Sequence, residues 1–229
     1  MNKIAKFEKV SLEEFTKAMK ELYPKYTFGE DEIEIMWKNI ILPARATKQS
    51  AGYDFFAPFE FILRPGCAVT IPTGIRVKID DGYAMALIPK SGIGVKSSTR
   101  LSNTIGLIDA DYYNSDNEGH IMVRMEMPVE PTSKLIPKMS GQGNLYGVDT
   151  QVVRKNLKIS ADQKFVQGVF IPFGITTDDD DTEKEDRNGG FGSTGETKPS
   201  VKEPTSGDPS TDPNAEPISN EDIAALLND

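Results

Sequence analysis

The stretch NTIGLIDADY, residues 103–112, is the part of the chain that says most about the fold. Its apolar residues can be held in a β-sheet, and the run ends in Asp109, Asp111 and Tyr112 near a turn. Such a position leaves backbone polar groups available to a ligand. The same pattern also fits a plain β-hairpin whose acids face water, so both interpretations stay open at this point.

Short β-rich runs surround this stretch from Pro43 to about Phe173. The turn sequences Arg64-Pro65-Gly66 and Asp80-Asp81-Gly82 separate some of them. Many short strands without intervening helices indicate an antiparallel sandwich, jelly roll or barrel. The strands are predicted at residues 54–61, 68–71, 74–79, 84–88, 121–127 and 165–173.

A helical extension is predicted before the β-rich region, over residues 1–40. Ser11 and Glu14 have the spacing of a capping box, and helical periodicity follows them. Ile33, Trp37 and Ile40 recur on one face of a second helix, so we expect Trp37 to pack that helix down and not to do chemistry.

The β-rich region, residues 41–177, contains one interruption and is followed by two polar segments. Residues 129–156 are rich in Pro, Gly and Lys and are interpreted as a surface excursion. Residues 178–195 form an acidic and then glycine-rich arm. Residues 196–229 hold eight acids, two lysines and five prolines, so we expect a disordered acidic tail.

Composition excludes several functions. The 229 residues carry a net charge of -9, which argues against broad binding to a nucleic-acid backbone. Cys67 and His120 are the only cysteine and histidine, so a disulfide within the chain and a Cys/His zinc cluster are ruled out, and neither residue is expected to be catalytic. The chain has no apolar run long enough to span a membrane and no secretory signal pattern, so a cytoplasmic protein is expected.

The arm contains the sequence GFGSTG at residues 190–195, which matches the pattern of a dinucleotide-binding loop. Its context rejects that function, because an acidic run precedes it and Pro199 follows where a helix should begin. What remains is a segment rich in backbone N–H groups and hydroxyls, with Arg187 before it. Such a segment suits closure over a phosphorylated base, although a linker would have a similar composition.

Three further segments combine small or polar residues with predicted strands. They are Ala51-Gly52-Tyr53-Asp54, Pro89-Lys90-Ser91-Gly92, and the run around Gln167, a polar residue in an otherwise apolar strand that calls for a partner or a ligand.

Taken in order, these five segments resemble the trimeric dUTP pyrophosphatase (dUTPase) family, in the forms found in Gram-positive bacteria and their phages. The resemblance extends from Ala51 to Gly195. It implies an all-β, jelly-roll β-barrel that assembles as a homotrimer. It also implies hydrolysis of dUTP to dUMP and pyrophosphate by water attack at the α-phosphorus, which keeps uracil out of DNA and supplies dUMP for thymidylate synthesis.

The resemblance also assigns roles to individual residues. Asp109 matches the aspartate that holds the deoxyribose 3′-OH and activates the water, and Tyr112 matches the ring under the deoxyribose. Mg²⁺ would be held mainly by the substrate phosphates and water, with Asp54 supporting. The remaining residues implied to bind substrate are Asn103, Gly106, Leu107, Ile108 and Met122 for uracil, Lys90, Ser91, Gly92 and Gln167 for phosphate, and Arg187, Phe191, Gly192, Ser193 and Thr194 in the arm.

The chain departs from the family pattern in four places. Lys90 stands where arginine is usual, which keeps the charge and loses the bidentate fork. The third motif is longer after Tyr112, the fourth has Asp162-Gln163-Lys164 in place of G-D-R, and the fifth is one residue short after Arg187. Because the principal residues remain, an active enzyme is expected.

Two rival functions share features of this sequence. The dCTP deaminases resemble dUTPases in barrel and trimer but lack the GFGSTG arm, which favours a dUTPase. The alternative from another class is a dUTPase-fold protein with an added regulatory role, binding a partner protein through residues 129–156.

Overall fold

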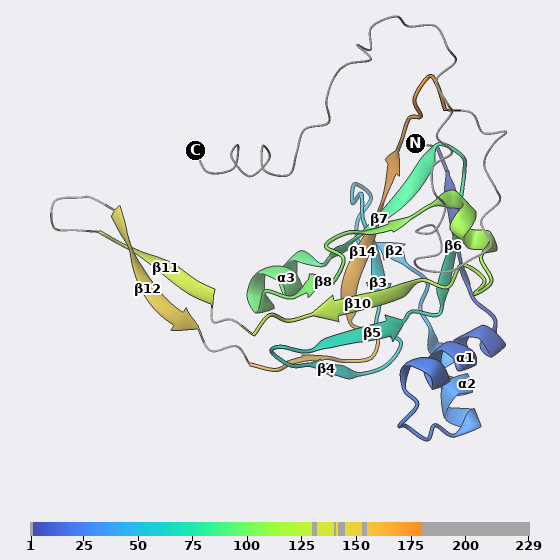
Figure 1. Ribbon diagram of the computed structural model, residues 1–229, viewed down its shortest axis with the longest axis horizontal. Coiled ribbons are helices and arrows are strands. Elements are labelled where there is room, and N and C mark those ends of the chain that lie inside the picture. Colours follow the sequence, from blue (N-terminus) through green and yellow to red (C-terminus); the bar gives the residue numbers. More distant parts are fainter. Residues whose placement is uncertain (1, 130–131, 140, 142–144, 153–154, 180–229) are drawn as a thin grey trace, which may run out of the picture. The chain divides into compact units, whose positions relative to one another are not determined.

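The computed structural model describes residues 2–129, 132–139, 141, 145–152 and 155–179. Within these residues the fold is mostly β with a few helices, and its strand pairs are antiparallel (Figure 1). The antiparallel β-rich architecture expected from the sequence is therefore confirmed.

Two sheets, which we call the framework sheets, hold the strands next to residues 103–112. The first has three strands in the order β5 (Ala68–Pro72), β10 (Met122–Glu126), β8 (Arg100–Leu101). The second has five, in the order β2 (Ala44–Arg45), β3 (Tyr53–Phe56), β14 (Lys164–Pro172), β7 (Tyr83–Pro89), β9 (Gly106–Ile108).

Two smaller sheets have two strands each. One pairs β4 (Phe61–Leu63) with β13 (Leu157–Ile159), and the other pairs β1 (Ala5–Lys9) with β6 (Ile75–Ile79). The single run predicted at residues 54–61 is wrong in one respect, because residues 57–60, with Pro58, divide it into β3 and β4. A proline has no N–H to donate to a ladder, which explains the break.

The N-terminal extension is not helical throughout, which corrects the prediction for residues 1–40. It begins with strand β1 and continues with α1 (Leu12–Leu22) and α2 (Glu30–Asn39). Ser11 caps α1 as predicted, since its Oγ accepts the N–H of Glu14 at 3.1 Å. The Glu14 carboxylate does not complete a capping box and instead lies 3.3 Å from Nδ1 of His120.

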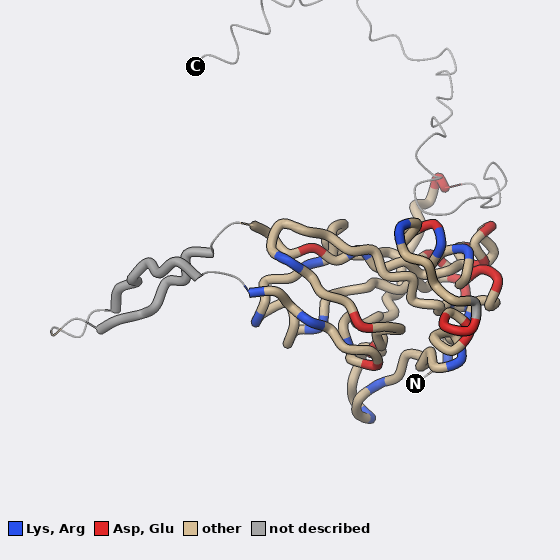
Figure 2. Tube along the Cα trace, turned by 90° about the horizontal axis from the view of Figure 1, so that it is seen from below, with Lys and Arg blue, Asp and Glu red and all other residues tan. Residues whose placement is uncertain are grey.

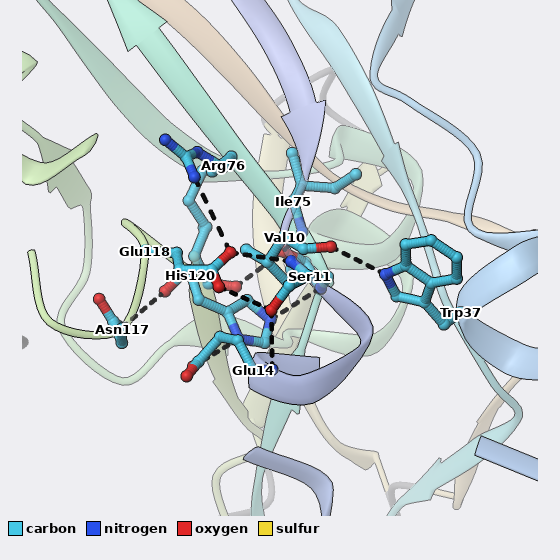
Figure 3. A network of polar contacts seen from close by, with 12 residues as sticks. Val10, Ser11, Glu14, Trp37, Ile75, Arg76, Asn117, Glu118 and His120 are labelled. Carbon is cyan, nitrogen blue, oxygen red and sulfur yellow. Dashed lines mark hydrogen bonds and ion pairs between the residues drawn. The ribbon is translucent and has the colours of Figure 1, made fainter. Parts of the chain in front are cut away.

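The hydrophobic core joins both helices to the sheets. Phe15 and Met19 of α1 pack with Phe55, Phe165 and other strand residues, and all four are almost fully buried. Each such side chain contributes about 1.5–3 kcal/mol through removal of apolar surface from water. Trp37 has the packing role predicted for it, because it lies against this core and its Nε1 donates to the carbonyl of Val10 at 2.8 Å (Figure 3).

The interruption at residues 129–156 contains regular structure. Strands β11 (Thr132–Met139) and β12 (Leu145–Val152) pair with each other in register from end to end, as a separate two-stranded sheet. The prediction of a surface excursion missed this hairpin, because Pro137 and the lysines obscure the alternation typical of strands.

Two short helices lie between strands of the framework. They are α3 (Ser91–Ser97) after β7 and the 3₁₀ helix η1 (Ala110–Asn114) after β9. Neither was predicted. The described helices include none that is long and apolar enough to cross a bilayer. The predictions for the acidic run, the arm and the tail beyond residue 179 fall outside the described residues.

Candidate functional site

A pocket of about 390 Å³ lies between the two framework sheets. It brings together Asn103, Gly106 and Met122, three of the residues expected to read a nucleobase. Its volume is within the range of small-ligand sites. The other lining residues come from the same strands and their connections and are Thr70, Leu87, Leu101, Ser102, Val123 and Arg124.

The turn that holds Asn103 is not a hairpin, which corrects one interpretation of residues 103–112. Strand β8 before it pairs with β10, whereas β9 after it pairs with β7, so the chain crosses from one sheet to the other. Thr104 has φ 65°, and the N–H of Ile105 donates to the carbonyl of Asn103 at 2.6 Å, which turns the chain sharply. The crossing places the backbone of this turn at the pocket.

Gly106 has a packing reason to lack a side chain. A Cβ built at this position would lie 3.2 Å from Cβ of Leu87 and 3.7 Å from Nδ2 of Asn103. A side chain would therefore press on β7 and occupy the pocket beside Asn103. Of the neighbouring residues predicted to bind the base, Ile108 is buried in the core and Leu107 is exposed, and neither lines the pocket.

Asp109 follows β9 directly and is the N-cap residue of η1. Its side chain is exposed, and it lies three residues beyond Gly106 along the strand, roughly 10 Å from that residue. A carboxylate at this distance from a base pocket is well placed to reach the sugar or the first phosphate. It is also a chemically suitable general base if it holds a water within hydrogen-bond reach.

Tyr112 is a core residue, with only 2% of its surface exposed. Its hydroxyl donates to the carbonyl of His120 at 2.9 Å and accepts from Nδ2 of Asn117 at 2.9 Å. It does not line the pocket. The contact of its ring with a deoxyribose stays a prediction.

Lys90, one of the residues expected at the phosphates, contacts a buried carboxylate. Asp54 on β3 is 2% exposed, and its Oδ1 accepts from Nζ of Lys90 at 2.6 Å while Nζ of Lys164 lies 2.9 Å from its Oδ2. Burial alone would raise the pKa of Asp54, but the hydrogen bonds and charges of the two lysines outweigh burial and lower the pKa overall. Asp54 is therefore ionised at neutral pH and holds two ammonium groups.

Strand pairing places Gln167 next to this cluster. Gln167 on β14 lies opposite Asp54 on β3 and opposite Ile88 on β7. Its side chain fills the space over Gly52, where a Cβ would come within 2.6 Å of Oε1 of Gln167. Gly52 thus has to be a glycine for this amide to keep its place.

Ser91 and Gly92 are the first residues of α3 and are exposed. The first N–H groups of a helix have no partner within the helix, so they are available to an anion. Together with Lys90 and Gln167 they form a group of phosphate-compatible donors, which we call the β7 end: Lys90, Ser91, Gly92 and Gln167.

The β7 end and Asp109 lie at opposite ends of one strand pair. Strands β7 and β9 are antiparallel, with Leu87 opposite Gly106. Lys90 lies three residues beyond this pair in one direction and Asp109 three residues beyond it in the other, so their Cα atoms are roughly 20 Å apart. Figure 1 shows α3, which follows Lys90, at the C-terminal end of β7. One chain therefore does not bring Asp109 and the β7 end to the same phosphate.

The described residues contain no group of three or more acidic, histidine or cysteine side chains that could cage a metal ion. Both carboxylate oxygens of Asp54 are occupied by lysines, so Asp54 does not fit as a direct ligand. The residues present fit a Mg²⁺ ion that enters with a triphosphate, since this ion commonly binds substrate phosphates and water.

The structure does not describe every predicted residue, and it adds two that were not predicted. Arg187, Phe191, Gly192, Ser193 and Thr194 lie outside the described residues. Sequence reasoning missed Lys164 as a partner of Asp54, and Arg124, which lines the pocket and donates to Oγ1 of Thr70 at 3.1 Å. The sequence signal for these two residues is limited to the alternation of residue types along β10 and β14. Basic and acidic positions are interspersed along the described trace (Figure 2), unlike the basic stripe that follows a nucleic-acid backbone.

The fold and site define a mostly β protein with a pocket of small-molecule size between two sheets, and an exposed carboxylate directly follows one of the strands that line it. The dUTPase family model matches residues 38–126. A deoxyuridine 5′-triphosphate nucleotidohydrolase of Lactococcus lactis is 36% identical over 167 residues, which cover 72% of this chain and 95% of the relative. One from Paraburkholderia phytofirmans is 34% identical, over 67% of this chain and 88% of the relative. The chain belongs to the dUTPase family.

A solved structure is similar as well. The dUTPase from Streptococcus mutans has 26% sequence identity and a TM-score of 0.47, and the match covers 74% of this chain and 97% of that one.

Proposed function

We propose that Asp109 orients and activates the water that attacks the α-phosphorus of dUTP. The chain is a dUTP diphosphatase, by its family and by curated relatives that it matches over most of their length. One observation supports the proposed site most strongly: Asn103 and Gly106 of the pocket lie just before and at the start of β9, and Asp109 follows the end of the same strand. A base in the pocket puts the sugar and first phosphate in the direction of that carboxylate.

The reaction balances with these groups alone. Water loses a proton to the Asp109 carboxylate as its oxygen bonds to the α-phosphorus. The bond from the α-phosphorus to the bridging oxygen breaks, and pyrophosphate leaves with the electron pair. Mg²⁺ bound by the substrate phosphates and water would neutralise part of the triphosphate charge.

The β7 end would bind the phosphates. Lys90 brings a positive charge, the N–H groups of Ser91 and Gly92 are oriented outward from the start of α3, and Gln167 adds an amide. Arg187, Phe191, Gly192, Ser193 and Thr194 of the arm would close over the base and the outer phosphates, excluding water from the site. These assignments rest on the family resemblance of the residues.

The roughly 20 Å that separate Asp109 from Lys90 support a site shared between subunits, and the number of subunits, three, is what the family resemblance implies. Both are expected near the α-phosphorus, so we infer that a site combines the pocket and Asp109 of one subunit with the β7 end of another. Cyclic assemblies form by contacts of this head-to-tail kind. The rival function of a dCTP deaminase is set aside by the family to which the chain belongs.

Nucleotide selectivity tests the proposed chemistry. With Mg²⁺ we expect pyrophosphate release from dUTP to exceed that from UTP, dCTP and dTTP by about 10²-fold in kcat/KM, because the turn at Asn103 reads the base and the sugar lies over a tightly packed segment. The measurement is coupled pyrophosphate detection on all four nucleotides. Equal rates with UTP would remove the assigned sugar selectivity, and ammonia release from dCTP would overturn the whole proposal.

Mixed trimers test the shared site. Asp109→Asn subunits and subunits carrying both Lys90→Ala and Gln167→Ala should each be nearly inactive alone. Co-expressed with two affinity tags and purified through both, they should recover about a third of the wild-type turnover per site, because every trimer that holds both kinds of subunit has one site of three with both intact halves. Absence of any recovery would show that each site is built from one chain.

The alternative role in binding a partner protein through residues 129–156 stays a prediction. The β11–β12 sheet offers two strand edges, to which an extended peptide can add.

A further inference from the structure

The hydroxyl of Tyr112 is held from two sides by the loop that follows η1. Nδ2 of Asn117 donates both to this hydroxyl at 2.9 Å and to the carbonyl of His120 at 3.2 Å, and the hydroxyl itself donates to the same carbonyl at 2.9 Å. The three groups form a closed triangle of hydrogen bonds in a nearly buried place. We call residues Asn117–His120 the clasp.

The backbone of the clasp is tightly folded. Glu118 and Gly119 have φ values of 55° and 69°, both in the left-handed region. A Cβ at Gly119 would come within 2.7 Å of the carbonyl oxygen of Tyr112 and of Cα of Tyr113, so only glycine lets the loop return this closely. A non-glycine residue in this region costs free energy that neighbouring contacts must offset.

Glu118 has those contacts, and they come from the start of α1. Its two carboxylate oxygens accept from the N–H of Ser11 at 2.8 Å and from Oγ of Ser11 at 2.6 Å (Figure 3). Arg76 lies 3.8 Å from Oε2 of Glu118. Burial alone would raise the pKa of Glu118, but the Ser11 hydrogen bonds and the Arg76 charge lower it overall, so the carboxylate is charged at neutral pH.

His120 fixes the other end of the clasp to the same segment. Its ring is fully buried, and Nε2 accepts the N–H of Gly74 at 2.8 Å. Nε2 therefore has no proton of its own, so Nδ1 carries the proton and donates toward Oε1 of Glu14 at 3.3 Å. Figure 3 shows Glu14 and Ser11, both from the beginning of α1, on either side of this network.

The clasp reaches Asp109 through η1. Tyr112 lies in the middle of this short helix, its N–H donates to the carbonyl of Asp109 at 3.3 Å, and its carbonyl accepts the N–H of Ser115. A five-residue 3₁₀ helix has little stability of its own. The side chain of Tyr112 is therefore one of the features that fix η1, and with it Asp109, to the body. Tyr113 is another, since its hydroxyl donates to Oε2 of Glu8 at 2.7 Å and Arg76 lies over its ring.

We propose that Asn117 and the main chain of His120 position Asp109 by holding the Tyr112 hydroxyl, with the N-terminal segment anchoring the clasp. The inference deepens the proposed function and rests on Asp109 being the group that activates water. It gives the lengthened third motif and the N-terminal extension a shared purpose. Asn117 is a positioning residue, since it acts through Tyr112 and η1.

A double-mutant cycle tests the clasp. Asn117→Ala and Tyr112→Phe each remove one partner of the same hydrogen bond, and each should lower kcat for dUTP about tenfold with less change in KM, as expected when a buried hydrogen-bond partner is lost. The double variant should lose less than the product of the two single losses, because the two changes have the hydrogen bond between Asn117 and Tyr112 in common. Asn114→Ala is the matched control: Asn114 is exposed in the same helix, and its kcat should equal that of the wild type.

Two further measurements keep the test decisive. Asn117→Asp has nearly the same shape and cannot donate, so it repeats the test if the alanine variant does not fold. Melting temperatures of the wild type, the two single variants and the double variant show whether the contact exists, since paired residues lose stability non-additively.

The outcomes separate the inference from the proposed function. Losses of kcat that multiply, or a kcat that stays unchanged while melting temperatures are coupled, overturn positioning. A wild-type protein without dUTP turnover overturns the proposed function instead, and additive melting shifts would then overturn the clasp as well.

Discussion

Replacing Asp109 with asparagine lowers kcat for dUTP by about 10²-fold or more, the usual scale for loss of a general base. Asparagine keeps the size of the side chain and can still bond a sugar hydroxyl, but it cannot take a proton from water. KM should therefore change much less than kcat, a pattern typical of an interaction made mainly in the transition state. Steady-state pyrophosphate release on the wild type and the variant measures both constants.

Asp111→Asn is the matched control for this substitution. Asp111 lies two residues further along, in the first turn of η1, and is also exposed. Its kcat should stay close to that of the wild type. A large loss there with a near-normal Asp109→Asn would assign the base to Asp111 and would also remove the reason for the clasp to act on Asp109.

Ending the chain after Thr177 abolishes turnover, whereas ending it after Gly195 leaves turnover nearly unchanged. The shorter form lacks Arg187, Phe191 and the hydroxyls of Ser193 and Thr194, so the site can neither exclude water nor bind the outer phosphates. A loss of about 10²-fold or more in kcat/KM is expected when such groups are removed. The longer form lacks only the acidic, proline-rich stretch, whose charge would repel a triphosphate.

Both truncated forms should keep the fold, because β14 ends at Pro172, before either cut. The N–H of Phe173 also donates to the carbonyl of Gly82 at 3.0 Å, and this contact remains in both. Oligomer mass and kcat/KM are measured together. Continued dUTP turnover by the shorter form would make the arm a linker, and loss of turnover by the longer form would give the tail a role in the reaction.

Local sequence signals predicted much of the fold. Ser11 as a helix cap, Trp37 as a packing residue and the turns at Gly66 and Gly82 all follow from short-range chemistry, and both glycines have the positive φ that such turns require. Strand β1 was missed, because its five residues include three charged side chains and its partner β6 lies about seventy residues away in the chain. Pairing over such distances leaves little trace in a local pattern.

The sequence proposes residues for the site and does not give their arrangement. The sequence motif identifies Asn103, Asp109 and Lys90, but only the register of β7 against β9 shows that Asp109 and Lys90 lie far apart. In the same way, the motif does not show that Tyr112 of η1 is buried and that its hydroxyl donates to the carbonyl of His120. Which side chains meet depends on sheet pairing, and pairing is a property of the whole fold.

The separation of Asp109 from the β7 end also has a genetic consequence. On the proposed assembly each subunit contributes residues to two different sites. An allele that damages only Asp109 or only Gln167 inactivates one site for each variant subunit, so activity should fall in proportion to its share of the total expression. An allele that damages both residues without weakening assembly inactivates two sites for each variant subunit, including one that holds an intact neighbour's residues, and should therefore be dominant-negative. A truncated chain that cannot assemble would instead be recessive, because it never reaches the sites of its neighbours.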